Sequence, residues 1–386
     1  MQAVAAEVVN SLKRYKYAQR MSTASAAADP QRPPRVVDVA REAGVSPGTV
    51  SNVYNRPEVV REELRVRVLE SAARLGFGGG DPTARSLRSG RAHALGVVFR
   101  ERLAYAFEDP AAVAMLQGVS DAADPHQLAL TILPAYPENG TSSGSGVRNA
   151  AVDSLLLYSL AGDDPLIKAV VQRRLPTVVI DAPAHLPEGF HFVGVDDHHV
   201  GRTAAEHLFE LGHRNIGLLS LRLSARDKPG FADLDVQARS TSDVARSRLA
   251  GAATVVTEYG LDWRGVPVVQ CQVSTAPEGR AAAQMLLDSY PDLTAILALS
   301  DSLALGALAE TQRRGLSVPA DLSIVGIDDT APEVARLTTI RQPHREKGRI
   351  AADLLIRQTS QRDLPTAPYL LPTELIVRGS TGINGR

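Results

Sequence analysis

The sequence predicts an α/β protein in which a small helical head precedes a larger core of doubly wound parallel sheets in two lobes. Residues 36–55 have the pattern of two short helices joined by a tight turn at Gly44. From Ala94 onward, short β-rich runs alternate with amphipathic helices, a pattern typical of parallel sheets covered on both faces. The β-rich runs are too many for one compact domain of this type, so two lobes are expected. A chain of 386 residues also exceeds the size at which single cores stop growing.

The head centres on the stretch VVDVAREAGVSPGTVSNVYN, Val36–Asn55. Gly44 takes the turn position, where a positive φ is favourable only without a Cβ. Ser46 and Pro47 follow as an N-cap and a proline in the first helical turn. Two helices joined in this way form a helix-turn-helix, whose second helix enters the major groove of DNA. An ordinary αα-hairpin in a helical domain is the alternative.

A third helix is predicted over Arg61–Leu75, where apolar residues recur along one face and Gly76 ends the pattern. Residues 1–34 are small, polar and proline-containing and predict a disordered tail. The first 91 residues carry 15 basic and nine acidic side chains, a net charge of +6, which leaves −7 for the rest. A basic head on an acidic body suits contact with phosphate, although a solvated charged face would explain it nearly as well.

Eight runs in the core predict strands: 94–99, 128–133, 154–158, 177–180, 192–195, 216–220, 295–299 and 323–327. Helices are predicted near 111–123, 164–174, 199–211, 243–259, 277–289, 302–314 and 344–361. Ligands of doubly wound folds bind at the carboxyl ends of the strands. The candidate ligand-binding residues are therefore the polar ones that follow strands: Asp181, Asp196, Asp197, Ser300, Asp301, Asp328 and Asp329.

Other classes of protein are disfavoured by the same sequence. No apolar run is long enough for a membrane span, and the N-terminus lacks the pattern of a secretory signal. Cys271 is alone, so no internal disulfide is possible, which fits a reducing cytoplasm. His198, His199, His207 and His213 lack the spacing of a metal site, and no serine stands in a nucleophile-elbow motif. We therefore expect no metal, no cofactor and no catalytic residue.

An ordered series of motifs resembles the LacI/GalR family of bacterial transcription regulators over residues 35 to about 380. The motifs are DVAREAGVSPGTVSNVYN in the head, ARSL at 84–87, VDDHHVGRTAAEHLFELGHRNIGLLS at 195–220, RLAG at 248–251, SDSLALGAL at 300–308, LSIVGIDDT at 322–330 and LTTIRQP at 337–343. The resemblance implies a DNA-binding head over 35–80, a hinge helix over 81–91 and an effector-binding core over 92–386. It implies a core like a periplasmic sugar-binding protein. Its N-lobe would comprise about 92–196 plus a crossover at 340–360, and its C-lobe about 197–339 plus the C-terminal segment.

The resemblance also implies a cytoplasmic homodimer that binds palindromic double-stranded operator DNA. It places the DNA-contacting residues at Ser46, Pro47, Gly48, Thr49, Ser51, Asn52 and Asn55. Hydroxyls such as those of Thr49 and Ser51 suit phosphate contacts, and an asparagine at position 52 prefers adenine. Ala84, Arg85 and Leu87 fall on the hinge, where the family's leucine wedges into the minor groove. A helix-packing leucine is the alternative for Leu87.

By the same resemblance, the effector would contact Asp181, Arg248, Ser300, Asp301, Asp328 and Gln342. Their chemistry suits a sugar, because carboxylates accept from paired hydroxyls and a guanidinium donates to two oxygens. Structural roles are the alternatives: Asp301 and Asp328 as helix caps, and Arg248 as a solvated helix residue. A ligand-controlled repressor is the resulting prediction. The alternatives for the whole chain are a sugar-binding protein without DNA function and a carbohydrate-active enzyme.

Two departures from the family pattern lead to further expectations. Arg35 stands where a Thr or Ser cap is usual, which is expected to cost about 1 kcal/mol of capping energy. The segment 221–245 is unusually long. It is expected to form a lid or partner surface at the cleft mouth, or else a disordered insert.

Overall fold

The computed structural model describes residues 32–79, 90–135, 144–161, 164–181, 186–224, 228–330, 336–360 and 367–385. The chain forms two compact units, residues 1–91 and 92–386, and each is described by itself. No helix among the described residues is long and apolar enough to cross a membrane.

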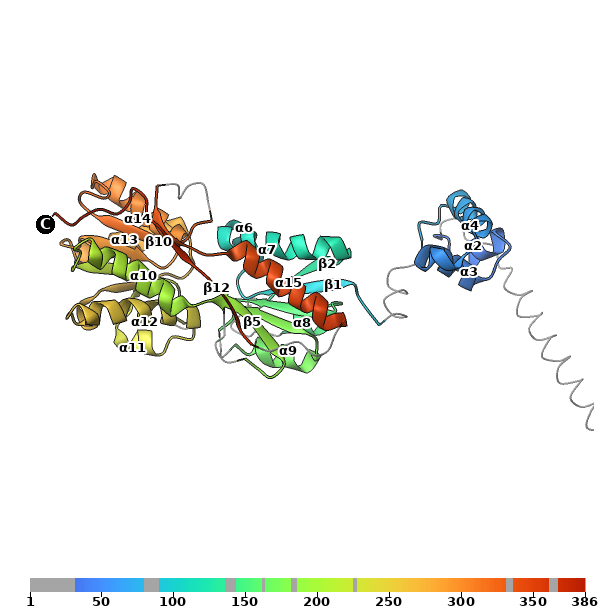
Figure 1. Cartoon of the computed structure of the whole chain (residues 1–386), viewed down its shortest axis with the longest axis horizontal. Coiled ribbons are helices and arrows are strands. Elements are labelled where there is room, and N and C mark those ends of the chain that lie inside the picture. Colours follow the sequence, from blue (N-terminus) through green and yellow to red (C-terminus); the bar gives the residue numbers. More distant parts are fainter. Residues whose placement is uncertain are drawn as a thin grey trace, which may run out of the picture. The chain divides into compact units, whose positions relative to one another are not determined.

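The first unit is a three-helix head (Figure 1). Its elements are α2 (Val36–Glu42), α3 (Pro47–Asn55), the 3₁₀ turn η1 (Pro57–Val59) and α4 (Glu62–Leu75). The side chains buried between the helices are Val39, Ala40, Ala43, Val50, Val53, Val68, Ala72 and Phe77. Gly44 has a φ of +63° between α2 and α3, as the predicted turn requires. The predicted helix-turn-helix is confirmed by this geometry.

The two helices of the motif begin differently. Ser46 caps α3, because its Oγ accepts from the backbone N–H of Thr49 at 3.1 Å. Arg35 provides no such acceptor at the start of α2. Its own backbone N–H instead donates to Asp38 Oδ2 at 2.9 Å, which satisfies one donor that a helix start leaves open.

The second unit contains two sheets, each in its own lobe (Figure 1). The N-lobe sheet has the order β12-β5-β4-β3-β1-β2 and is parallel throughout. Its strands are β1 (Ala94–Phe99), β2 (Ala129–Pro134), β3 (Ser154–Tyr158), β4 (Thr177–Ile180), β5 (Phe190–Val195) and β12 (Tyr369–Leu371). Its helices are α6 (Leu103–Glu108), α7 (Pro110–Ala123), α8 (Ser145–Asn149), α9 (Leu166–Arg173) and α15 (His344–Ser360).

The C-lobe sheet has the order β13-β11-β10-β9-β6-β8-β7, with antiparallel strands only at its edges. Its strands are β6 (Ile216–Ser220), β7 (Gly230–Phe231), β8 (Val268–Gln270), β9 (Ala295–Ala298), β10 (Ser323–Asp328), β11 (Thr338–Arg341) and β13 (Glu374–Ile376). Its helices are α10 (Asp197–Glu210), α11 (Leu234–Ala238), α12 (Asp243–Glu258), α13 (Ala276–Ser289) and α14 (Asp301–Arg314). The predicted α/β architecture of two doubly wound lobes is confirmed.

The chain passes between the lobes three times, from β5 to α10, from β11 to α15 and from β12 to β13. The crossing from β11 to α15 contains Gln342, one of the predicted effector residues. The lobes also meet at the side chains of Glu101 and Arg222, which form an ion pair. Beside it, the Tyr105 hydroxyl lies 3.4 Å from the carbonyl oxygen of Ser274. These contacts join α6 of the N-lobe to the carboxyl edge of the C-lobe sheet.

Two glycines bring α10 and α12 into backbone contact. A Cβ on Gly201 would lie 2.0 Å from the carbonyl oxygen of Arg248, and one on Gly251 would lie 2.0 Å from that of His198. Because real Cβ atoms are not found at such distances, only glycine allows this approach. The close packing places Arg248 of α12 against Asp197 at the start of α10.

The segment 221–245 is folded where the structure describes it. Its Gly230–Phe231 pairs antiparallel with β8, and its short helix α11 is held by Gln237, whose Oε1 accepts from Trp263 Nε1 at 2.9 Å. Ser240 is buried and donates to the carbonyl oxygen of Leu223. The alternative of a disordered insert is therefore wrong for these residues, which extend the C-lobe sheet at its edge.

Candidate functional site

The candidate DNA-contacting surface is the outer face of α3. Pro47, Gly48 and Asn52 are exposed, whereas Val50 and Val53 on the opposite face are buried in the head. Thr49 and Ser51 are half-buried at the flanks. The residues predicted to face base edges are thus the exposed ones of this helix, as a recognition helix requires.

Four of the predicted contact residues, Ser46, Thr49, Ser51 and Asn55, already have side-chain partners within the head. Ser46 Oγ accepts from the Thr49 amide and lies 2.9 Å from the Thr49 hydroxyl. Asn55 Nδ2 donates to the Ser51 carbonyl oxygen at 2.8 Å. Asn52 has no side-chain hydrogen bond within the described part of the chain, so its amide is available to a partner outside it. The predicted hinge residues Ala84, Arg85 and Leu87 lie outside the described residues.

In the core, the predicted effector residues come together where strands of both lobes end. Asp181 follows β4 in the N-lobe, Asp328 ends β10 in the C-lobe, and Gln342 lies in the crossing between β11 and α15. Gln342 Nε2 donates to Asp328 Oδ1 at 2.9 Å, and Gln342 Oε1 accepts from Lys347 Nζ at the same distance. Lys347 Nζ also donates to Asp181 Oδ1 at 2.6 Å. One chain of hydrogen bonds therefore connects the two lobes, and we call these residues with His344 the interlobe network.

Arg248 is buried in the C-lobe and is not a solvated helix residue. It is only 5% exposed, its Nε donates to Asp197 Oδ1 at 2.7 Å, and its Nη1 donates to the carbonyl oxygen of Leu299 at 2.8 Å. The alternative of an exposed position is wrong because the glycine-mediated contact of α10 and α12 buries it. Asp197, which the sequence marks only as a polar residue that follows a strand, is the partner of Arg248.

Ser300 and Asp301 have different roles at the start of α14. Ser300, and not Asp301, caps α14, since its Oγ accepts from the Leu303 amide at 3.3 Å. Asp301 Oδ1 instead accepts from the Thr339 hydroxyl, and its Oδ2 accepts from the Asp329 amide, each at 2.6 Å. A Cβ at Gly326 of β10 would lie 2.2 Å from Asp301 Oδ1, so this glycine makes room for the carboxylate.

The carboxylates at the strand ends hold unusual backbone conformations. The φ values of Asp181, Asp328 and Asp329 are +68°, +133° and +56°. Such values are rare for residues other than glycine and are concentrated at ligand-binding sites, where surrounding contacts stabilise them. Asp328 accepts from Gln342 and His344, and Asp329 pairs with Arg341 and Arg378 at 2.8 Å each. Asp329 therefore joins two arginines in the C-lobe, which is a structural role.

Burial raises the pKa values of several of these acids. The pKa of Asp328 rises to about 6, mainly through burial, with Arg248 and Lys347 opposing the shift. The pKa values of Asp301 and of Asp109, the N-cap of α7, rise to about 7 through burial and the nearby charge of Asp328. Burial and the charge of Lys347 lower the pKa of His344 to about 3, so its ring is neutral at pH 7. Asp109, Asp301 and Asp328 are therefore three acids whose pKa values lie close to neutral pH.

Replacing Asp109 with asparagine is expected to stabilise the protein more at pH 8 than at pH 5. The folded-state pKa of about 7 lies above the ordinary 3.8, so the protonated group favours folding, and that contribution is lost as pH rises through 7. Asparagine still caps α7 but carries no charge. Thermal unfolding of Asp109→Asn and of Asp262→Asn, an exposed N-cap in the C-lobe, checks this. An equal pH dependence of both differences would contradict the expectation.

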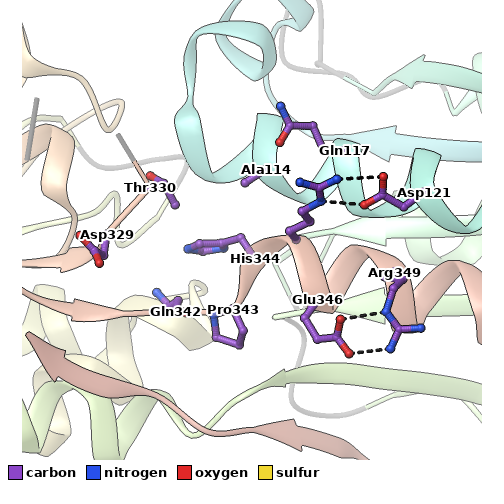
Figure 2. Close-up of a pocket in the computed structure, with 11 residues that line it drawn as sticks. Ala114, Gln117, Asp121, Asp329, Thr330, Gln342, Pro343, His344, Glu346 and Arg349 are labelled. Carbon is purple, nitrogen blue, oxygen red and sulfur yellow. Dashed lines mark hydrogen bonds and ion pairs between the residues drawn. The ribbon is translucent and has the colours of Figure 1, made fainter. Parts of the chain in front are cut away.

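A cavity of about 510 Å³ adjoins the interlobe network at the start of α15 (Figure 2). Gln342 and His344 belong to its wall, together with Ala114 and Gln117 of α7 and with Thr330. Two ion pairs, Arg345 with Asp121 and Arg349 with Glu346, are formed by residues that line it. Its volume is within the range of small-molecule pockets. Arg248, Asp181 and Lys347 do not line it. Of the interlobe network, the cavity therefore reaches only Gln342 and His344.

Sequence reasoning did not assign His344 or Lys347 to the site. Lys347 is fully buried, and His344 is 4% exposed with its Nε2 3.2 Å from Asp328 Oδ1. The available signal was their position, since both lie in the first turn of a helix that directly follows Gln342. Local sequence gives no reason to place a lysine of that turn in a buried site, because buried lysines are rare.

The histidines considered as metal ligands have hydroxyl partners instead. His213 Nδ1 lies 2.9 Å from Thr294 Oγ1, His207 Nε2 lies 2.9 Å from Thr381 Oγ1, and His198 Nε2 lies 3.3 Å from Thr254 Oγ1. Among the described residues, no three His, Cys, Asp or Glu side chains are arranged to hold a metal ion.

Both the head and the core match known protein families. Residues 36–78 match the bacterial regulatory proteins of the lacI family, and residues 205–381 match the periplasmic binding protein-like domain. The HTH-type transcriptional regulator IpsA of Corynebacterium glutamicum is 42% identical over 326 residues, 83% of this chain and 90% of that protein. The HTH-type transcriptional regulator CelR of Thermobifida fusca is 30% identical over 357 residues, 91% and 99% of the two chains. These relatives are transcriptional regulators rather than enzymes.

Solved structures lead to the same assignment. A LacI-family transcriptional regulator from Corynebacterium glutamicum, 36% identical, has a TM-score of 0.71 over 92% of this chain and 100% of that one. The lac repressor dimer bound to operator and the anti-inducer ONPF, 26% identical, has a TM-score of 0.72 over 91% and 100%. The helix-turn-helix head and the two-lobed core thus occur together in the relatives as they do here. The chain belongs to the LacI family of bacterial transcriptional regulators.

Proposed function

We propose that this protein is a repressor that binds a palindromic operator as a homodimer and that a neutral sugar or sugar derivative in the core controls its affinity for DNA. The observation that carries the proposal is the interlobe network. Asp328 of the C-lobe is hydrogen-bonded to Gln342 and His344, which lie where the chain crosses from β11 to α15. Lys347 is hydrogen-bonded both to Gln342 and to Asp181 of the N-lobe. A ligand that exchanges hydrogen bonds with this network changes the contacts between the lobes.

The chemistry of the cleft favours hydroxyl groups as ligands. Asp181, Asp301 and Asp328 offer acceptor oxygens, and Arg248 and Lys347 offer charged donors. The related regulator CelR has been solved as a complex with cellobiose, at 27% identity to this chain and a TM-score of 0.65. This relative supports a sugar as the class of effector. A catalytic role has no comparable support, and we propose none.

The chemistry of the head supports DNA as the second partner. Asn52 and the backbone at Gly48 are exposed on α3, whereas the apolar residues of that helix are buried. An asparagine that faces base edges favours adenine. The lac repressor, which resembles this chain over 91% of its length, has been solved as a dimer bound to operator. Operator binding in turn implies a location where the chromosome is accessible, in the cytoplasm.

Fluorescence anisotropy on a palindromic duplex from upstream of the gene tests this function. The expected result is binding at least about 1,000-fold tighter than to a scrambled duplex at the same salt concentration. At least one neutral sugar among D-glucose, D-galactose, D-ribose and cellobiose is expected to change that affinity by about 5- to 150-fold. Equal affinity for the palindrome and the scrambled duplex would contradict sequence-specific regulation. A DNA affinity that no sugar changes would contradict the proposed effector.

A further inference from the structure

The first turn of α15 contains two buried polar side chains whose hydrogen-bonding capacity is not filled by the described residues. They are His344 and Lys347, three positions apart, so they lie on the same face of the helix. His344 also forms part of the cavity wall beside Gln342 (Figure 2). Buried polar groups almost always have partners, so two incomplete ones on one helical turn require an explanation.

Lys347 has one N–H group more than it uses. An ammonium group has three donors. Two of them are accounted for by Asp181 Oδ1 at 2.6 Å and Gln342 Oε1 at 2.9 Å. No third acceptor is present among the described residues, although the side chain is fully buried. A charged donor that is buried with an unused proton indicates an acceptor supplied from outside the chain.

His344 is complementary to Lys347 because it has a free acceptor. Its Nε2 faces Asp328 Oδ1 at 3.2 Å, and an ionised carboxylate can only accept, so Nε2 bears the proton of the neutral ring. Nδ1 is then an acceptor, and this buried atom has no hydrogen-bond partner among the residues that the structure describes. The same turn of α15 therefore contains one donor and one acceptor that the described residues leave unused.

We propose that Lys347 and His344 form a recognition pair for effector hydroxyls, in which Lys347 donates to a hydroxyl oxygen and His344 Nδ1 accepts a hydroxyl proton. This inference rests on the proposed effector-binding function and specifies the ligand class at that site. An alcohol both accepts and donates, whereas a phosphate or carboxylate anion only accepts and leaves Nδ1 without a partner. An anion would also meet the carboxylates of Asp181, Asp301 and Asp328. The pair therefore selects neutral polyhydroxylated effectors over their acidic derivatives.

Isothermal titration calorimetry with the full chain tests the pair, using D-glucose, D-galactose, D-ribose and cellobiose as probes. For the sugar that binds best, Lys347→Met is expected to weaken binding at least about 10-fold, since a hydrogen bond to a charged group is lost. Lys168→Met removes a lysine from the exposed surface of α9 and is expected to bind as the wild type does. The double variant Asp181→Asn/Lys347→Met removes both charges and remains usable if the single variant unfolds.

Monodeoxy analogues of the same sugar distinguish direct contact from a structural effect. If Lys347 touches one hydroxyl, removal of that hydroxyl weakens binding to the wild type about 10-fold but changes binding to Lys347→Met less than about twofold. The same comparison with the double variant gives the same result. Equal losses for every analogue in wild type and variants would overturn the inference and leave the proposed function intact.

Two further outcomes decide the ligand class. The 6-phosphate of a hexose that binds is expected to bind at least about 10-fold more weakly than the hexose itself. Tighter binding of the phosphate would overturn the neutral-hydroxyl assignment. Failure of the wild type to bind any of the four sugars would overturn both the proposed sugar effector and this inference. Sugar binding that does not depend on Lys347 would overturn this inference alone.

Discussion

Replacement of Arg248 by methionine is expected to destabilise the core by about 3–5 kcal/mol, because it leaves the buried carboxylate of Asp197 without its partner. The same replacement is expected to abolish effector binding, because it removes a proposed donor to the effector. Asp197 is 8% exposed and Arg248 5%, so solvent does not compensate for the lost charge. The Leu299 carbonyl oxygen also loses its donor from Nη1. Urea unfolding measures the change in stability, and titration calorimetry measures the loss of binding.

The double variant Asp197→Asn/Arg248→Met provides the control for this prediction. Removing both charges is expected to recover much of the lost stability, since a buried pair costs nearly as much to desolvate as its attraction returns. It is not expected to recover effector binding, because the donor to the effector is still missing. A loss below about 1 kcal/mol in the single variant would contradict the assignment of a desolvated ion pair.

The second large effect is expected at the head, where Asn52→Asp should weaken operator binding about 100-fold without changing the melting temperature. The two side chains are nearly equal in size, so the change replaces an amide donor with a carboxylate that DNA phosphates repel. Asn52 is exposed and makes no side-chain hydrogen bond within the described residues, so folding has little to lose. Fluorescence anisotropy on the operator duplex measures the affinity.

Asn149→Asp introduces the same charge on the exposed surface of α8 in the core and serves as the matched control. It is expected to bind operator within about twofold of the wild type, because a single surface charge in the other unit is screened beyond about 10 Å at ordinary salt. Equal losses in Asn52→Asp and Asn149→Asp would show that net charge, and not the face of α3, accounts for the effect.

The regular elements could be predicted from sequence because their patterns are local. The predicted runs at 94–99, 154–158, 177–180 and 216–220 match β1, β3, β4 and β6 residue for residue. The strands that escaped prediction are short: β7, β8, β12 and β13 have two or three residues each, and β11 has four. Such strands exist through pairing with distant neighbours, which local periodicity does not encode.

The site shows the same division between local and tertiary information. Asp181, Asp328 and Gln342 were predicted from strand ends and motif order, and the structure connects them through hydrogen bonds. Lys347 was missed because its burial depends on Asp181, which lies 166 positions earlier in the chain. Arg248 was left between two roles for a related reason. Its burial follows from the contact of α10 with α12 at Gly201 and Gly251, which no local pattern reveals.

In the proposed repressor, effector binding in the core and operator binding by the head are thermodynamically linked. The most direct test measures the dissociation constant of the effector sugar by calorimetry with free protein and with protein saturated by operator duplex. We predict a change of about 5- to 150-fold, equal to the factor by which saturating sugar changes operator affinity, since linkage must be reciprocal. Identical effector affinity in the presence and absence of operator would contradict the account.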